Sequence, residues 1–149
     1  MKSRNVVLCL AVVGLGTNVN VARAQNTLGE LLDAGATKLT KEQVMDTVIG
    51  GTVSGPRPAG GSVETTYKAN GEYSGNYNNP QGQGKAKQGG FFGKWTLDDN
   101  GKLCQEGTSA LGQAVEACFF YFRGKDQLFV TVGSDSDRSA VALKRSVSR

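Results

Sequence analysis

The residues of this chain that could do covalent chemistry are few, and the most conspicuous are two of its three cysteines. Cys104 and Cys118 both lie in the part of the chain richest in aromatic residues, from Gly90 to Phe122. If the first 24 residues are removed on export, these two cysteines remain, and an oxidising compartment permits a single pairing. We predict a disulfide that stabilises the fold by roughly 3 kcal/mol for a loop of about 15 residues. The alternatives are a redox pair or half of a metal site. Neither is favoured, because the two cysteines do not have C-x-x-C spacing and the chain has no histidine.

Catalytic residues are not identified by any sequence pattern. The chain has no histidine, which is the commonest general base, and no S-x-x-K or G-x-S-x-G string marks an activated serine. Paired carboxylates of a glycan hydrolase could still form if distant acids converge, as every small domain allows. The catalytic residues stay unknown, and an enzyme is the less favoured interpretation. The acids that could converge are Glu64, Glu72, Glu106 and Glu116.

Neither a cofactor nor a metal is predicted. The segment from Gly82 to Ala86 superficially resembles a phosphate loop, but Asn79 stands where the first glycine should be, and no Ser or Thr follows the lysine. Asp135 and Asp137 have the D-x-D spacing of a calcium loop. That loop would need a glutamate at its twelfth position, where this chain has Ser146.

The first 24 residues have the pattern of a secretory signal peptide. Lys2 and Arg4 give a basic start, the run from Val6 to Gly16 is apolar, and Ala22-Arg23-Ala24 is a cleavage motif. The apolar run is shorter than the roughly 20 residues of a membrane-spanning helix. We therefore expect a periplasmic or secreted protein that does not span a membrane after cleavage. Residues 25–149 then form a single domain.

Charge argues against a nucleic-acid partner. The leader carries three of the 17 basic residues and none of the 13 acidic ones, so the rest of the chain has a net charge of about +1. Lysines near aromatic residues could bind a single strand, but nucleic-acid binding needs a larger basic excess. Polar turns are the segments expected to face some other partner. Their residues are Asp98, Asp99, Asn100, Asp135, Asp137, Lys85 and Lys87.

Two short helices are predicted after the leader. Thr27 with Glu30, and Thr40 with Gln43, have the spacing of capping boxes. Apolar residues follow each cap at helical spacing, and glycine ends each segment. Helices this short owe their stability to packing, so we expect them to cover a sheet.

Beyond Gly51 the apolar residues alternate with period two, which is typical of strands. We expect seven or eight antiparallel strands that form a strongly curled sheet or a small barrel. Together with the helices this gives an α+β fold. The glycine- and asparagine-rich segment from Gly75 to Gly90 is predicted as a flexible loop, and Ser139 to Lys144 as the closing strand.

Turn residues indicate the register of two hairpins. A three-residue loop ending in Gly71 pairs Tyr67 with Tyr73, which keeps both rings on one face. At Asp98-Asp99-Asn100-Gly101, Leu97 pairs with Leu103 or, with a tighter turn, with Cys104. The sequence leaves this choice open.

A third hairpin is predicted at Gly124-Lys125. This turn sets Tyr121 opposite Leu128 and makes both faces of the hairpin apolar. Such a hairpin needs a core beneath it and a cover above it.

Three stretches carry a family resemblance. The sequences L-L-D-A-G-A-T-K-L-T-K-E-Q-V, G-K-W-T-L-D-D-N-G-K-L-C and C-F-F-Y-F-R-G resemble those of small exported bacterial proteins with a domain of unknown function, the one numbered nine-nine-five. The resemblance implies export and a compact β-rich domain, and it supplies no catalytic residues. This chain departs from the family pattern in the long insertion from Gly75 to Gly90.

Three functions are compatible with these features, in decreasing order of preference. The first is a non-catalytic binding protein for an envelope component or a small ligand. The second is an inhibitor of a cell-wall hydrolase such as lysozyme, with an acidic turn placed in the basic cleft of the enzyme. The third is a two-carboxylate glycan hydrolase.

Overall fold

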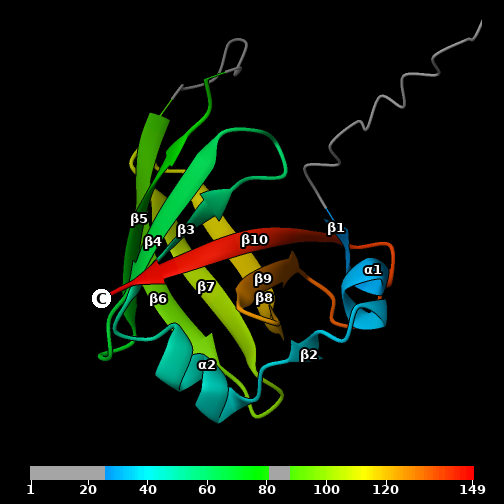
Figure 1. Ribbon diagram of the computed structural model, residues 1–149. Helices are drawn as coiled ribbons and strands as arrows, with labels where there is room; N and C mark the ends of the chain where they lie inside the picture. Colours follow the sequence, from blue (N-terminus) through cyan, green and yellow to red (C-terminus); the bar gives the residue numbers. More distant parts are fainter. Residues whose placement is uncertain (1–25, 81–87) are drawn as a thin grey trace, which may run out of the picture.

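The computed structural model describes residues 26–80 and 88–149, and these fold into a closed antiparallel barrel (Figure 1). Eight strands pair in sequence order, and the last strand returns to pair with the first. This is an up-and-down barrel, so the predicted curled or closed antiparallel sheet is confirmed as closed. The barrel strands are β3 (Thr52–Pro56), β4 (Ser62–Tyr67), β5 (Glu72–Asn78), β6 (Gln88–Leu97), β7 (Lys102–Ser109), β8 (Ala114–Gly124), β9 (Gln127–Val132) and β10 (Val141–Ser148).

Four short elements precede the barrel. They are β1 (Asn26–Thr27), α1 (Leu28–Asp33), β2 (Thr37–Lys38) and α2 (Lys41–Thr47). β1 pairs with β10 and β2 pairs with β8, so the N-terminal segment is attached to the barrel at two separate strands.

The inner face of the barrel follows from the alternation of apolar residues. Directly opposite residues of antiparallel strands share a face, and the pairs run Tyr67 to Tyr73, Tyr73 to Gly93 and Gly93 to Gly107. Glycine is required at the last position because a Cβ on Gly107 would lie 2.7 Å from the hydroxyl oxygen of Tyr73. Along this row two tyrosines are therefore followed by two glycines, and the ring of Tyr73 occupies the space over Gly107.

The buried interior is mainly aliphatic and aromatic. Leu103 and Val130 are fully buried, and Tyr67, Tyr73 and Tyr121 are each 2% exposed. These side chains form one cluster with residues of α2 and of the segment just before it. The remaining members are Leu39, Val44, Val48, Ile49, Val53, Leu128 and Leu143.

Helix α2 lies across one end of the barrel (Figure 1). Its capping box is formed, because Thr40 accepts a hydrogen bond from the Gln43 backbone and the Gln43 side chain accepts one from the Thr40 backbone. The apolar side chains Val44 and Val48 belong to the interior cluster. This end of the barrel is therefore closed by helix packing.

Helix α1 lies against the outside of the barrel. Leu28 and Leu31 pack with Phe120, Phe122 and Phe129 in a second buried cluster, and these three phenylalanines point outward from β8 and β9. The sequence predicts both helices as a cover over the sheet, and that prediction is not borne out. One helix covers an outer patch and the other closes an end, because a closed barrel buries its own inner face.

Two predicted registers are settled by the strand pairing. Tyr67 lies opposite Tyr73, as expected. Leu97 lies opposite Leu103, which decides the choice that the sequence leaves open. The segment predicted as a flexible loop from Gly75 to Gly90 is too long at both ends, since β5 continues to Asn78 and β6 begins at Gln88.

The register predicted for the third hairpin differs from the observed one by two residues. Tyr121 lies opposite Val130 instead of Leu128, and the turn residues are Lys125 and Asp126. Lys125 adopts a left-handed conformation (φ 49°) that glycine adopts more readily, so the sequence favours the neighbouring Gly124 as a turn residue. A shift of two residues leaves every side chain on the same face, so both faces of the hairpin are apolar, as predicted.

The predicted disulfide between Cys104 and Cys118 is present. The two residues lie directly opposite each other on β7 and β8. Their neighbours Gln105 and Ala117 point inward, so the bond lies on the outer face. The closing strand also differs from its predicted limits, because it spans Val141–Ser148 rather than Ser139 to Lys144.

The proposed signal peptide lies outside the described residues and stays a prediction. Among residues 26–80 and 88–149, no helix has both the length and the apolar character needed to cross a bilayer.

Stability should depend strongly on the barrel interior. We expect Leu103→Ala to lower the free energy of unfolding by about 2–5 kcal/mol, because it leaves a cavity at a fully buried position. The control is Leu111→Ala, at a side chain that is 67% exposed, which should change stability by about 0.5 kcal/mol or less. Urea unfolding of both variants gives the comparison, and equal losses would contradict the assignment of the interior.

Candidate functional site

A cavity of about 690 Å³ lies at the end of the barrel away from α2. α2 precedes the start of β3, whereas the cavity is bordered by Arg57 and Pro58, which follow the end of β3. Asn79 after β5 and Leu111 between β7 and β8 border the same end. An eight-stranded barrel is wide enough to hold one small ligand, as in lipocalins and streptavidin. One end is thus plugged by a helix, and the other is hollow.

The cavity walls are mostly apolar, and within residues 26–80 and 88–149 no acidic side chain lines them. Phe91 and Phe119 are partly buried and pack against the interior cluster. Leu111 and Val132, which are 67% and 47% exposed, lie at the opening. The other lining residues are Val63, Tyr77, Gln105, Ser109, Gln113, Ala114, Val115, Ala117 and Arg145.

Arg145 is the buried charge of this cavity. Its side chain projects from β10 and the residue is only 7% exposed. Nη1 donates to the carbonyl oxygens of Pro56 at 2.8 Å and Lys144 at 2.9 Å. The guanidinium passes close to Gly55, where a Cβ would lie 2.7 Å from Nη1. Glycine at this position therefore makes room for the arginine.

No carboxylate pairs with Arg145 among the described residues. Nε and Nη2 likewise have no hydrogen-bond partner in that part of the chain. Burial lowers the pKa of Arg145 from its usual value, but an arginine remains protonated in proteins. The cavity therefore contains a positive charge that the described side chains do not neutralise.

A polar network lies beside Arg145. The amide Nε2 of Gln105 donates to the hydroxyl of Tyr67 at 2.6 Å, and the hydroxyls of Tyr67 and Tyr121 interact electrostatically. Burial is the main reason that the pKa of Tyr67 is well above its usual value, and burial raises the pKa of Tyr121 to about 12. The positive charge of Arg145 opposes both rises, which places the guanidinium near the two hydroxyls.

A second arginine lies at the mouth of the cavity. The guanidinium carbon of Arg57 is 4.6 Å from the ring centre of Tyr77, a cation–π arrangement. Its Nη1 is buried without a hydrogen-bond partner in the described chain, and so is Oδ1 of Asn79. Both residues line the cavity, so its entrance contains one hydrogen-bond donor and one acceptor that have no partner among the described residues.

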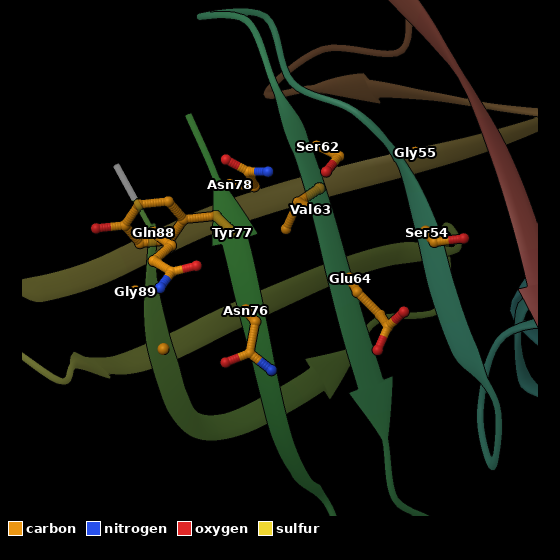
Figure 2. A pocket seen from close by; sticks show the side chains of 11 residues that line it. Ser54, Gly55, Ser62, Val63, Glu64, Asn76, Tyr77, Asn78, Gln88 and Gly89 are labelled. Carbon is orange, nitrogen blue, oxygen red and sulfur yellow. The ribbon is translucent and has the colours of Figure 1, made fainter. Parts of the chain in front are cut away.

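A separate hollow of about 770 Å³ lies on the outer face of β3 to β6 (Figure 2). Ser54, Glu64 and Asn76 lie opposite one another on three adjacent strands and form one row of it. Asn78 and Gln88 belong to the next row. These polar side chains are mostly exposed and none is a buried charge. The barrel cavity is therefore the stronger candidate for a binding site.

The glutamates proposed for glycan hydrolysis do not meet in the barrel cavity. Glu106 and Glu116 lie opposite each other on the outer face of β7 and β8, where both are exposed. Glu64 lines the hollow on the outer face of β3 to β6, and Glu72 forms an ion pair with Lys68. General-acid catalysis by a carboxyl usually depends on burial of that carboxyl, and all four of these residues are exposed.

The first acidic turn joins β6 to β7. Asp98 accepts hydrogen bonds from the backbone nitrogens of Asn100 and Lys102, and Asp99 lies 2.7 Å from Nζ of Lys41. The hydrogen bond from Lys41 lowers the pKa of Asp99. This turn therefore stabilises its own loop and neutralises part of its charge.

The second acidic segment lies between β9 and β10. Asp135 lies 2.6 Å from Nζ of Lys38, whose hydrogen bond lowers the pKa of the carboxyl. Asp137 accepts hydrogen bonds from the backbone and hydroxyl of Ser139. Lys85 and Lys87 lie outside the described residues. A partner-facing role for all these loops stays a prediction.

Sequence reasoning did not identify Arg145. An arginine in a strand is ordinarily read as exposed, and the predicted closing strand ended one residue before it. Side chains two residues apart on a strand point to the same face, so Arg145 lies on the same inner face as the apolar Leu143. This alternation is the feature of the sequence that could identify it.

Comparison of the chain with protein-family models, with curated proteins and with solved structures yields no match. The resemblance to the exported family described above stays a prediction.

The buried tyrosines should make the fold sensitive to alkaline pH. A folded-state pKa above the unfolded value contributes stability below the unfolded pKa, and this contribution is lost as pH rises toward the folded pKa. Stability should therefore fall between pH 10 and about 12, by about 3 kcal/mol for Tyr121. Urea unfolding at several pH values should show a smaller fall in Tyr121→Phe. The control Tyr77→Phe should behave like wild type, and a fall that is unchanged in Tyr121→Phe would contradict the argument.

Proposed function

We propose that this chain is an exported, non-catalytic binding protein that takes a small, largely apolar ligand into the open end of its barrel. The observation that carries the proposal is the cavity of about 690 Å³, which is within the usual range for small-molecule sites. Its walls combine apolar side chains with a few polar groups, the composition that orients a ligand.

The two ends of the barrel support this function in different ways. α2 packs Val44 and Val48 into the interior, which closes one end and gives the cavity a floor. At the other end the exposed side chains of Leu111 and Val132 offer an apolar entrance. A ligand would enter between the loops that join the strands and stop at the packed core.

Export is supported by the leader pattern and by the disulfide. A disulfide is typical of proteins in oxidising compartments, and Cys104 and Cys118 are bonded. A carrier or sensor in the periplasm or outside the cell would use the cavity to hold a molecule that water dissolves poorly.

A bulky side chain in the cavity should remove binding. Ala117 lines the cavity wall, and we expect Ala117→Trp to weaken binding of the uncharged fluorescent probe N-phenyl-1-naphthylamine by about tenfold or more, equivalent to about 1.4 kcal/mol. Fluorescence titration of the purified disulfide-bonded protein measures this.

The matched control is Ala34→Trp, because Ala34 is exposed at the end of α1. It should bind the probe like wild type. A wild-type protein that does not bind the probe, or equal binding by both variants, would overturn the proposed site.

A further inference from the structure

Resting on the proposed function, we infer that the ligand carries a single carboxylate, which Arg145 binds at the inner part of the cavity. The inference starts from an imbalance of charge. Arg145 is 7% exposed and has no carboxylate partner among the described residues. Buried charges in proteins are normally paired, because an uncompensated charge in an apolar interior is strongly unfavourable. A bound anion would provide the missing pair.

The geometry of the guanidinium leaves one edge for this anion. Nη1 is held by the carbonyl oxygens of Pro56 and Lys144. Nε and Nη2 have no partner in the described chain, and together they form an edge with two parallel N–H donors. A carboxylate has two oxygens at matching spacing and binds such an edge with two hydrogen bonds. A neutral hydroxyl could satisfy only one donor.

The surroundings favour an anion over a cation. No acidic side chain lines the cavity in the part of the chain that the structure describes, and Arg57 adds a second positive charge at its mouth. An anion entering from solvent would pass Arg57 before it reaches Arg145. In a cleft with apolar walls such charges are weakly screened and concentrate a ligand of opposite sign.

The number of charges points to a carboxylate rather than a phosphate. Among the described lining residues Arg145 is the one buried cation, since Arg57 is less buried and stacks on Tyr77. A monoanion balances one guanidinium, whereas a dianion would bring an unpaired negative charge into the interior. The network of Gln105, Tyr67 and Tyr121 surrounds the site with neutral groups.

The apolar walls define the rest of the ligand. With the carboxylate at Arg145, the body of the ligand would lie against Phe91, Ala117 and Phe119 and extend toward Leu111. The ligand class is therefore an apolar or aromatic monocarboxylic acid, bound with its head inward.

The test compares three probes with the same apolar chain: decanoate, decan-1-ol and decyl phosphate. Isothermal titration calorimetry on the full disulfide-bonded protein should show decanoate binding about tenfold or more tightly than decan-1-ol, and more tightly than decyl phosphate. In Arg145→Met the preference for decanoate over decan-1-ol should disappear while decan-1-ol still binds. A buried ion replaced by an apolar side chain of similar size is often tolerated, and thermal unfolding of the variant checks this. Arg123→Met removes an exposed arginine at the α2 end of the barrel, away from the cavity, and should leave the preference intact.

The outcomes separate the two proposals. If wild type binds none of the probes, the proposed function itself fails. If wild type binds decan-1-ol and decanoate equally, or if the preference survives in Arg145→Met, the carboxylate inference fails and the apolar site stands. Tighter binding of decyl phosphate than of decanoate would overturn the assignment of a single charge. The comparison in wild type needs no variant, so it decides the inference even if Arg145→Met does not fold.

Discussion

Closure of the sheet by β10 is the constraint on which the rest of this structure depends. Leu143, Lys144 and Arg145 pair with β9, and the next three residues pair with β3. Without this strand the sheet would have two open edges, with unpaired backbone groups and an exposed inner face. Arg145 lies where β10 passes from one neighbour to the other, and its side chain bonds the last carbonyl of β3. The residue that we assign to ligand binding therefore also contributes to the seam of the barrel.

Closure explains why the two helices have such different positions. A closed barrel buries its own inner face, so no helix is needed to cover it. What remains are one outer apolar patch, formed by Phe120, Phe122 and Phe129, and one end of the interior. α1 covers the patch and α2 fills the end. The N-terminal segment is thus used where the barrel cannot bury its own apolar surface.

The hairpins are the part of the fold that the sequence predicts best, because their determinants are local. Turn glycines and the need to keep Tyr67 and Tyr73 on one face fix the register at Gly71. Where a non-glycine residue takes the left-handed position, as Lys125 does, the register is misread by two residues. Face assignment survives this error because side chains alternate with period two.

The candidate site is harder to predict because it depends on closure around the whole barrel. Arg57, Gln105 and Arg145 come from three distant parts of the chain, and no spacing in the sequence brings them together. The cavity itself depends on where large side chains meet glycines across strands, as Arg145 meets Gly55. Such long-range complementarity leaves no periodic signal. The acidic turns can be recognised in the sequence, but in the structure their carboxylates pair with side chains of this same chain, as Asp135 does with Lys38.

The interior of this barrel is less apolar than stability alone would favour. An eight-stranded barrel can be filled entirely by side chains, and a buried ion is often replaced by apolar residues without loss of stability. Here the interior retains Arg145, Gln105 and three tyrosines, and one end stays hollow although the other is packed. Folding alone does not require a guanidinium without a carboxylate at the inner part of an apolar cavity. A ligand that neutralises this charge would stabilise the folded protein in proportion to its affinity, so binding and the stability of the barrel seam would be coupled through the same side chain.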